Sequence, residues 1–393
     1  MARRRDRVRF SGGGHRAGAE AAGGFGTRSA SDRDRASNHP PDRDHTSRSD
    51  DPPAPSYVRV RGRSLRNIVD GNHPMFGMLT TRARSRPCRV AVPPAMQRHE
   101  FRSMGMDIAV MAPAAADERQ DRDFLRAAGG VERVFEQMDA RFSRFRQDSE
   151  LSAVNGRAGR RQTVSQPFAE LLEASLSAAR ATNGLFDPTV LPALIAAGYD
   201  RDYDELLATT PVVRTPPASA RWSDVLLEGR LLFLPEGAAL DFGGIAKGWA
   251  ADLAAHSIGS LPWALIDAGG DLRIAGQPAE PVPIGVADPA DPSIEILQLG
   301  VEAGALATSS VVGRRWGVGL HHLIDPRTSL PACTGVVQAT VWAPTCTEAE
   351  ILAKRAILEG PAVLPMISAA LVLTDGRVLT SLGGRQDWES LAC

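Results

Sequence analysis

Two kinds of hydrophobic and polar pattern divide the chain. Residues 1 to about 95 are rich in Arg, Asp, Ser, Gly, Pro and His, contain few aliphatic side chains, and show neither a helical nor a strand period. Such a stretch buries too little apolar surface to offset the entropy lost when it is ordered. We therefore predict a disordered extension at residues 1–95 and a folded domain at residues 96–393. Alternating Arg and Asp disfavour the alternative of a basic binding tail.

Apolar side chains recur every three or four residues in two segments of the folded domain, which is typical of the buried face of a helix. The two series are Val131, Val134, Phe135, Met138 and Phe142, and Phe168, Leu171, Leu172, Ser175, Leu176 and Ala179. Two more helices are expected. One follows residues 243–244, with Ile245, Trp249 and Leu253 on one face, and the other lies at about residues 347–358.

Strand-like runs lie before, between and after these helices. They occur at residues 107–112, 231–234, 263–266, 283–286, 336–342 and 371–373. Because helices and strands alternate irregularly, the pattern favours an α+β fold over a regular array of βαβ units.

Composition and charge exclude several classes of protein. The chain has 393 residues, of which 43% are hydrophobic, and a formal net charge of -1. No bulk electrostatic field therefore favours nucleic acid or an anionic membrane as a partner, and any anion must be held by a local site. The longest apolar run, residues 362–373, is shorter than the roughly 20 residues of a membrane span and is expected in the core.

Cysteine spacing and the N-terminal residues indicate the cellular compartment in which the protein is expected. The four cysteines lack CxxC or metal-ligand spacing, so we expect free thiols; they are Cys88, Cys333, Cys346 and Cys393. No apolar run follows the arginines at residues 3–5, unlike the pattern of a secretory signal peptide. A cytoplasmic protein without a membrane-spanning segment is therefore expected.

The segment from Leu240 to Gly248 combines a strand end, a glycine pair and a helix start. Glycines let the backbone approach a ligand closely, and the N–H groups and dipole of a helix start favour a phosphate. Lys247 could add a positive charge. The spacing matches neither a Walker loop nor GxGxxG, so a plain connection explains the segment equally well on its own.

A second glycine pair lies between the carboxylates Asp267 and Asp271. This arrangement predicts either a tight turn beneath a ligand or a surface hairpin with solvated acids. A third glycine turn, at residues 183–190, would end a helix at Gly184 and continue with a rigid Asp-Pro turn.

Two candidate catalytic groups follow. Adjacent His321 and His322 point to opposite faces of an extended segment, so one of them can face a site. A neutral imidazole beside a phosphate could act as a general base, although a structural role is also possible. Glu350 and Lys354 lie four residues apart on one helix face, where a solvated ion pair is the simple alternative.

Taken together and in this order, the segments resemble the ApbE family of FAD:protein FMN transferases from about Phe101 to the C-terminus. The landmarks are residues 104–106, 138–145, 148–155, 184–189, 241–248, 269–271, 307–309 with Arg314, and 322–328. The resemblance implies an α+β, T-fold-like architecture in which FAD lies in a cleft between two sub-domains. It also implies the positions that contact FAD, namely Met104, Phe145, Leu185, Phe186, Asp187, Asp241, Lys247 and Leu323.

The resemblance also implies a metal site, from which this chain departs. Typical members hold Mg²⁺ with a backbone carbonyl, here that of Gly244, and with an Asp and a Thr of the last helix. The matching residues are Glu350 and Lys354, and a protonated Lys has no acceptor for a cation. Either Glu350 holds Mg²⁺ with the help of water, or Lys354 neutralises the pyrophosphate instead. Our hypothesis at this point is that metal dependence is retained.

The implied reaction transfers FMN from FAD to a Ser or Thr hydroxyl of an acceptor protein, with a membrane redox protein as one candidate acceptor, and releases AMP. His322 is the candidate base and Glu350, with its metal, the group that offsets phosphoryl charge. Two alternatives stay open: hydrolysis of FAD to FMN and AMP, and FAD binding without catalysis.

Overall fold

The computed structural model describes residues 56–58, 88–90, 96–216, 221–382 and 390–391. Most of the predicted extension at residues 1–95 lies outside these residues, so its disorder stays a prediction. Within that stretch, Ser56–Val58 and Cys88–Val90 form two short strands, β1 and β2, that the sequence pattern did not predict.

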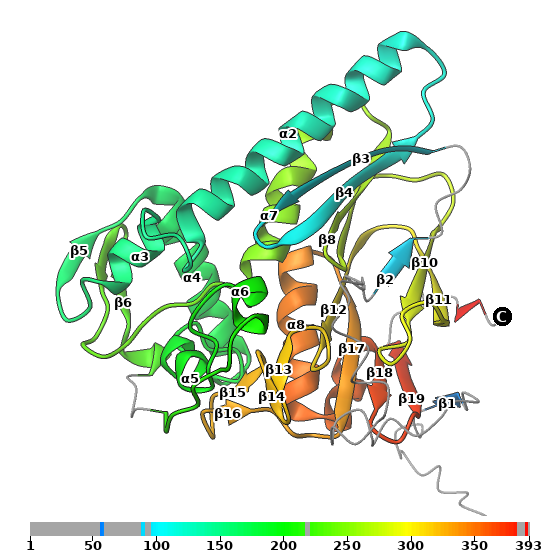
Figure 1. Cartoon of the computed structure of the whole chain (residues 1–393). Coiled ribbons are helices and arrows are strands. Elements are labelled where there is room, and N and C mark those ends of the chain that lie inside the picture. The colour runs from blue at the N-terminus through cyan, green and yellow to red at the C-terminus, as the bar shows by residue number, and fades with distance from the viewer. Residues whose placement is uncertain (1–55, 59–87, 91–95, 217–220, 383–389, 392–393) are drawn as a thin grey trace, which may run out of the picture. The chain divides into compact units, whose positions relative to one another are not determined.

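The central element is a nine-stranded antiparallel sheet (Figure 1). In spatial order its strands are β1, β19 (Val378–Leu382), β18 (Ser368–Leu373), β17 (Val336–Ala343), β12 (Gly304–Ser310), β9 (Asp271–Gly276), β8 (Trp263–Ala268), β4 (Met106–Pro113) and β3 (Met96–Ser103). Four of the six predicted strands, those at residues 107–112, 263–266, 336–342 and 371–373, belong to this sheet, and they are confirmed.

Both faces of the sheet are covered. Ile108 and Val110 of β4 belong to the core beneath the helices, whereas the alternate residues Ala109 and Met111 face a second sheet. That sheet contains β2, β10 (Val282–Ala287), β11 (Glu295–Val301) and β20 (Ser390–Leu391), which confirms the predicted strand at residues 283–286. A period of two with apolar residues on both sides therefore reflects a strand buried between two layers.

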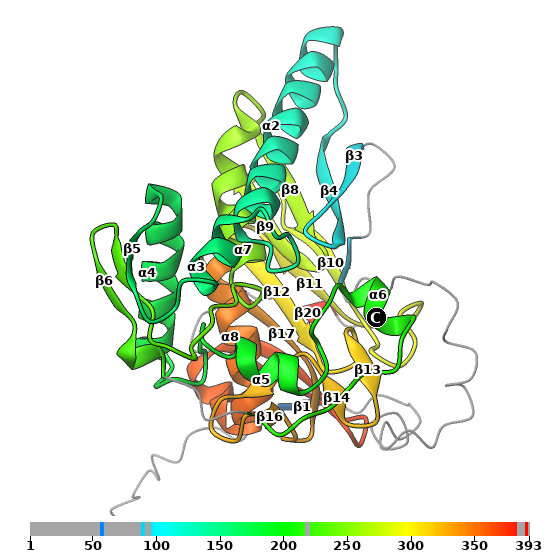
Figure 2. The same cartoon turned by 60° about the vertical axis from the view of Figure 1, so that its left-hand side comes forward.

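Three helices cover the other face: α2 (Glu118–Phe142), α7 (Ala246–Ala254) and α8 (Cys346–Glu359) (Figure 2). The stripe predicted on α2 is buried, with Val134 partly buried at its edge. On the face predicted for α7, Ile245 is buried in the core and Trp249 packs against it, but Leu253 was wrongly included, because it is 42% exposed. The buried residues within the helix are Ala and Gly. The reason is the proximity of α8: a Cβ atom on Gly248 would lie 2.5 Å from the carbonyl oxygen of Cys346.

Helices α7 and α8 cap one another. The N-cap residue of α7, Ile245, offers no capping side chain, and Glu350 of α8 instead accepts a hydrogen bond from the backbone N–H of Gly248 at 2.8 Å. In return, Asp252 of α7 accepts the backbone N–H groups of Cys346 and Thr347, both at 2.9 Å. First-turn N–H groups have no partner within their own helix, so each carboxylate satisfies donors of the other helix.

The remaining elements surround the site. They are α3 (Glu150–Asn155), β5 (Arg161–Thr163), α4 (Gln166–Ala181), α5 (Leu191–Ala196), α6 (Tyr203–Leu207), β6 (Leu226–Glu228), β7 (Leu231–Phe233), β13 (Arg315–Gly317), β14 (Leu320–His321), β15 (Ile324–Asp325) and β16 (Leu330–Pro331), with three short 3₁₀ helices at residues 222–224, 255–258 and 361–366. The stripe predicted on α4 is buried throughout, and β7 confirms the strand predicted near residues 231–234.

The longest apolar run forms a 3₁₀ helix and β18, and Val363, Leu364 and Ile367 are core residues as expected. In the described part of the chain, no helix has both the length and the apolar character needed to cross a membrane. Cys333 and Cys346 are free thiols, as predicted.

Candidate functional site

A cavity of about 570 Å³ is lined by five separate parts of the chain: the β3–β4 turn, the α2–α3 segment, the α4–α6 region, the loop before α7, and residues from β14 to α8. The structure brings eleven of the twelve predicted site residues to its wall. They are Met104, Phe145, Leu185, Phe186, Asp187, Asp241, Gly244, Lys247, His322, Leu323 and Lys354. The twelfth, Glu350, is fully buried behind the wall and contacts both lysines.

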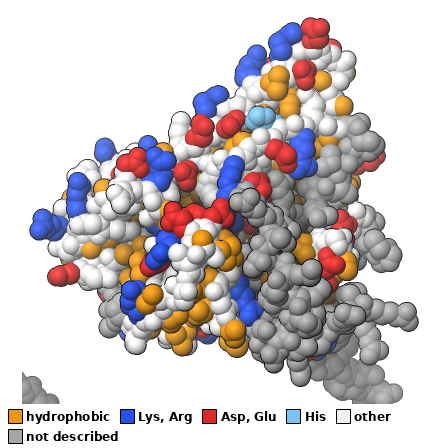
Figure 3. Space-filling view, viewed as in Figure 1, with side chains coloured by type: hydrophobic (Ala, Val, Ile, Leu, Met, Phe, Trp, Pro, Cys, Tyr) orange, Lys and Arg blue, Asp and Glu red, His pale blue; other side chains and the backbone are white. Residues whose placement is uncertain are grey.

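The surface around α6 is acidic. Figure 3 shows acidic side chains gathered over this helix, where Asp204 and Glu205 are exposed, and hydrophobic side chains over α5 and the β15–β16 hairpin. Ile195 of α5 and Leu330 of β16 are 37% and 54% exposed. Charge at the cavity wall is therefore mixed, so any dinucleotide phosphate has to be bound by particular cations rather than by a general field.

Met104 owes its position to a tight turn. Met104 and Gly105 form the two-residue loop of the β3–β4 hairpin, and their φ angles are 52° and 69°. Positive φ at both loop residues is the geometry that matches the twist of a hairpin, and it is unfavourable for Met. The turn brings the Met104 side chain to the cavity and against the core.

The loop before α7 is organised by Asp241. One carboxylate oxygen accepts the backbone N–H of Gly243 at 2.7 Å, and the other forms an ion pair with Arg144 at 2.9 Å. The side chain of Asn155 holds the preceding residue, Leu240, through two backbone hydrogen bonds of 2.8 and 2.9 Å. Asp241 therefore fixes the loop and orients Arg144 at the cavity wall.

Arg144, Phe145, Tyr199 and Trp316 form what we call the aromatic cluster. The guanidinium carbon of Arg144 lies 4.2 Å from the ring centre of Phe145 and 4.5 Å from that of Tyr199. Tyr199 in turn stacks on Trp316 at 5.1 Å between centroids. A cation between two rings is held by their quadrupoles, and exposed aromatic rings at the cavity wall can pack against a planar heteroaromatic ligand.

Phe186 and Asp187 follow the end of α4. The helix end is held by Thr182, whose hydroxyl accepts the backbone N–H of Phe186 at 2.9 Å. Asp187 accepts hydrogen bonds from the N–H and hydroxyl of Thr189 at 2.7 and 2.6 Å. Burial raises the pKa of Asp187, and the bonds from Thr189 offset only part of that effect. The predicted Asp-Pro turn thus exists and orients this carboxyl at the cavity.

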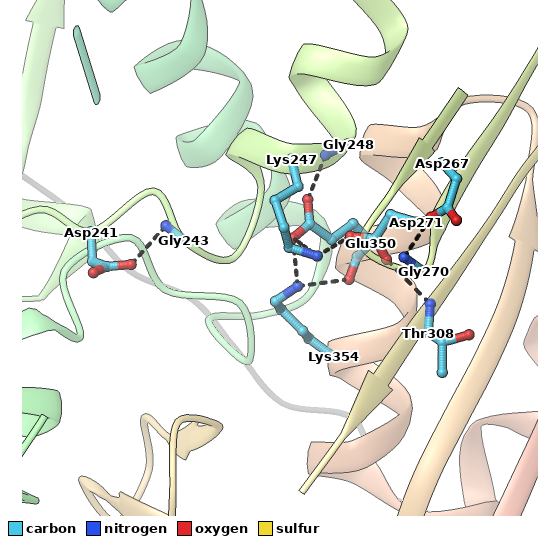
Figure 4. A network of polar contacts seen from close by, with 10 residues as sticks. All are labelled: Asp241, Gly243, Lys247, Gly248, Asp267, Gly270, Asp271, Thr308, Glu350 and Lys354. Carbon is cyan, nitrogen blue, oxygen red and sulfur yellow. Dashed lines mark hydrogen bonds and ion pairs between the residues drawn. The ribbon is translucent and has the colours of Figure 1, made fainter. Parts of the chain in front are cut away.

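Lys247, Asp271, Glu350 and Lys354 form the charged cluster (Figure 4). Lys247 of α7 contacts Asp271 of β9 and lies 3.5 Å from Glu350 Oε1. Lys354 Nζ lies 2.9 Å from the same Oε1 atom. Figure 4 shows Glu350 between the two lysines. Burial of opposite charges in contact is stable when all of them are paired and hydrogen-bonded.

The ionisation of the charged cluster follows from these contacts. Burial alone would lower the pKa of Lys247, but Asp271 and Glu350 together raise it above its ordinary value. Burial opposes ionisation of Glu350, yet Lys354, Lys247 and the N–H of Gly248 hold its pKa below the ordinary value. For Asp271, burial dominates over Lys247, and the pKa is raised.

The structure excludes one of the two predictions for the glycine turn between Asp267 and Asp271. Gly269 and Gly270, with φ of 66° and 97°, form the turn between β8 and β9, and the flanking carboxylates Asp267 and Asp271 are 2% and 1% exposed. A surface hairpin with solvated acids is therefore wrong. Asp267 accepts the N–H of Gly270 at 2.8 Å, which shapes the turn, and Asp271 pairs with Lys247 behind the cavity wall.

The metal site implied by the resemblance fits these residues poorly. Glu350 is 0% exposed; its Oε2 accepts the N–H of Gly248, and its Oε1 faces the ammonium groups of Lys354 and Lys247. A hard cation needs several free oxygens. Across residues 96–216 and 221–382 and the short described strands, no group of three or more His, Cys, Asp or Glu side chains could hold a metal.

The two histidines have different environments. His321 is 6% exposed; its Nε2 donates to the carbonyl of Ala332 at 3.1 Å, its Nδ1 accepts the N–H of Leu323 at 3.3 Å, and burial lowers its pKa to about 4. His322 lines the cavity. Its Nδ1 lies 3.3 Å from the carbonyl of Arg314, and because a carbonyl only accepts, the proton is assigned to Nδ1 and the lone pair to Nε2.

The pKa of His322 lies well below its ordinary value, first because the ring is desolvated and then because Arg314 is close. Its imidazole is therefore neutral at physiological pH and has a free lone pair on Nε2, as a general base requires. Arg314 also lines the cavity.

Five residues described above were not predicted as site residues: Arg144, Tyr199, Asp271, Arg314 and Trp316. Arg144 and Arg314 lie inside the landmark segments, so their position beside Phe145 and His322 could have indicated them. Asp271 lies in the landmark segment 269–271 and was interpreted as part of a turn, either beneath a ligand or at the surface. Tyr199 lies in no glycine turn and no charged pattern, and only the tertiary fold brings it to Arg144.

Comparison with known proteins identifies the family and agrees with the fold. The model of the ApbE family matches residues 104–371. A curated relative from Treponema pallidum (strain Nichols), named FAD:protein FMN transferase, is 31% identical over 290 residues, which is 64% of this chain and 79% of the relative. A second with that name, from Vibrio cholerae, is 28% identical over 248 residues, 58% of this chain and 72% of the relative.

Solved structures show the same architecture. The flavin transferase ApbE from Vibrio cholerae has a TM-score of 0.61 at 25% identity, covering 74% of this chain and 98% of that chain. The ApbE protein from Thermotoga maritima has a TM-score of 0.64 at 24% identity, covering 73% and 97%. The expected α+β, T-fold-like architecture is therefore confirmed.

Proposed function

Since the chain belongs to the ApbE family, we propose that it is an FAD:protein FMN transferase that moves FMN from FAD to a Ser or Thr hydroxyl of another protein. The observation that carries the proposal is the single cavity where the predicted flavin-contacting residues meet His322 and two lysines. An aromatic surface for a flat ring and cations for a phosphate bridge lie on the walls of one space, as binding of a dinucleotide requires.

In the proposed reaction, the acceptor hydroxyl oxygen attacks the phosphorus of the FMN half of FAD. The bond from that phosphorus to the bridging oxygen breaks, and AMP leaves with this oxygen. The hydroxyl proton passes to Nε2 of His322, whose Nδ1–H is held by the carbonyl of Arg314. Lys247, Lys354 and Arg314 offset the charge on the phosphoryl oxygens.

Mg²⁺ has no step in this mechanism, because both carboxylate oxygens of Glu350 are engaged by the protein. The role proposed for Glu350 is to hold the two lysines and the start of α7. A membrane redox protein as acceptor and a cytoplasmic location, both expected from the sequence, stay predictions.

The test is to incubate the purified protein with FAD and with membrane and soluble fractions of the source cells. We expect a fluorescent protein band that survives denaturation, together with one AMP for each flavin bound. AMP without a labelled band would indicate FAD hydrolysis. Bound FAD without AMP in any fraction would contradict the proposal and identify a flavin-binding protein.

A further inference from the structure

The chain contains almost no lysine, and the lysines it has converge on one place. Of its 45 Lys and Arg residues only Lys247 and Lys354 are lysines, and both belong to the charged cluster. An ammonium is a compact charge with three donors, whereas a guanidinium is a wide planar fork. In a chain that otherwise uses arginine, a pair of lysines at one buried site indicates that the site requires the compact cation.

The space around Lys354 is consistent with that requirement. Its side chain is 13% exposed and runs beneath Gly244: a Cβ atom on Gly244 would lie 3.3 Å from Lys354 Cε and 3.1 Å from a ring carbon of Phe186. Gly244 is the residue whose carbonyl would hold Mg²⁺ if this chain followed the typical family pattern. The Lys354 side chain therefore occupies the neighbourhood of that predicted metal position.

Both carboxylate oxygens of Glu350 are already engaged by the protein. Its Oε2 accepts the N–H of Gly248 at 2.8 Å, and its Oε1 contacts Lys354 Nζ at 2.9 Å and faces Lys247 Nζ at 3.5 Å. The carboxylate is 0% exposed. A metal ion at Oε1 would compete with the ammonium groups, and one at Oε2 would compete with the N–H that caps α7, so either would weaken the pairing of a buried charge or a buried N–H.

Lys354 also lines the same cavity as His322, the proposed base. Two of its N–H groups are directed at Glu350. Lys354 Nζ lies 2.9 Å from Oε1 of Glu350 and 3.5 Å from its backbone carbonyl oxygen. An ammonium has three donors, so one remains for an oxygen of a ligand in the cavity.

We propose that Lys354 neutralises the phosphate bridge of FAD in place of Mg²⁺, so that this chain transfers FMN without a divalent cation. The inference rests on the proposed function. The bonds made and broken are unchanged, and the proton still goes to His322. Compared with the Asp, Thr and Mg²⁺ of the typical family pattern, the Glu350 and Lys354 pair keeps a cation at the bridge but lowers the net charge there by one.

The first experiment uses the unmodified full chain. AMP release and flavin labelling are measured with FAD after removal of metals, in excess EDTA and then in excess Mg²⁺, and FAD affinity is measured under both conditions by quenching of flavin fluorescence. We expect rates and affinities that agree within about twofold, which is less than the tenfold change that 1.4 kcal/mol would produce. A loss of about tenfold or more in EDTA that Mg²⁺ reverses would overturn the inference.

The second experiment restores the typical ligand pair with Glu350→Asp and Lys354→Thr, and a Lys354→Thr single variant keeps the cap on α7 should the double variant unfold. Loss of a charged hydrogen-bond partner should weaken FAD binding in EDTA by about 10- to 100-fold, and Mg²⁺ should restore it. Arg355→Gln is the matched control, because Arg355 lies next to Lys354 but pairs with Glu359 at 2.7 Å. Variants that stay folded and bind FAD in EDTA as well as the parent would overturn the inference.

The two proposals fail in different ways. AMP release that depends on Mg²⁺ in the unmodified chain overturns the role of Lys354 and leaves the transferase function intact. Absence of AMP release and of labelling in both EDTA and Mg²⁺ overturns the transferase function and, with it, the inference.

Discussion

The charged cluster and the aromatic cluster share one cavity but are held by different forces. In the charged cluster, Asp271 and Glu350 are at most 1% exposed, and each accepts a backbone N–H as well as a lysine. In the aromatic cluster, Phe145 is 39% exposed and is held by ring contacts. Substitutions in the charged cluster should therefore affect the fold and the chemistry together, whereas substitutions in the aromatic cluster should affect ligand affinity alone.

The largest effect on stability is expected for Glu350→Gln. The change leaves two partly buried lysines facing one remaining carboxylate, and removing one partner of a buried ion pair typically costs about 3–5 kcal/mol. The free energy of unfolding, measured by denaturant titration, should fall by that amount. Glu348→Gln is the control, because Glu348 is exposed on the same helix. Equal stabilities of the two variants would show that Glu350 does not hold the charged cluster.

The largest effect on the reaction at unchanged stability is expected for His322→Ala. A positioned base typically contributes about 10²–10⁴-fold, so AMP release should fall by this factor while FAD still binds. His256, an exposed histidine of the second 3₁₀ helix, provides the control His256→Ala. Turnover similar in both variants would exclude His322 as the base.

The pH dependence tests the same residue without a mutation. Because the pKa of His322 lies well below 6.5, first through desolvation and then through Arg314, its base form is present at neutral pH and is lost only as the pH falls through that lowered value. The profile of kcat/KM, which reports the free enzyme, should be level from neutral to mildly alkaline pH and decline only in acid. A half-maximal rate above pH 6.5 would contradict this.

The smallest effect is expected in the aromatic cluster. Phe145→Leu removes a ring that covers Arg144, and aromatic contacts contribute about 0.5–1.5 kcal/mol beyond area, so the Kd for FAD should rise by about two- to tenfold. Phe145→Tyr keeps the ring and should change the Kd less. Both values can be obtained by fluorescence titration. A loss of folding stability in Phe145→Leu would contradict the expectation that substitutions in the aromatic cluster affect ligand affinity alone.

The two clusters differ in how far their residues could be predicted from the sequence. Lys247, Glu350 and Lys354 were singled out because glycine turns, helix starts and a four-residue spacing leave visible traces in the sequence. Their arrangement was not predictable, since the contact between α7 and α8 joins residues about a hundred positions apart. Tyr199 could not be predicted from a sequence pattern. A ring that packs on another side chain is identified only when the residue opposite to it in the fold is known.

The fold was largely predictable for similar reasons. Strands and helices with a clear period were identified, including the strands at residues 107–112 and 336–342. Leu253 of α7 was wrongly expected on the buried face because its period follows the large apolar residues, whereas a helix in close contact with another buries its smallest residues. Leu253 therefore points to solvent, while Ala250 and Ala251 are in the core.

Gly248 allows α7 and α8 to pack in close contact. Its backbone lies against that of Cys346 so closely that even one methyl group has no room. This contact packs α7, which carries Lys247, against α8, which carries Lys354. The backbone positions from which the two lysines extend are thus determined by contact of main chain with main chain. A residue larger than glycine at position 248 would force α7 away from α8, and the two lysines with them.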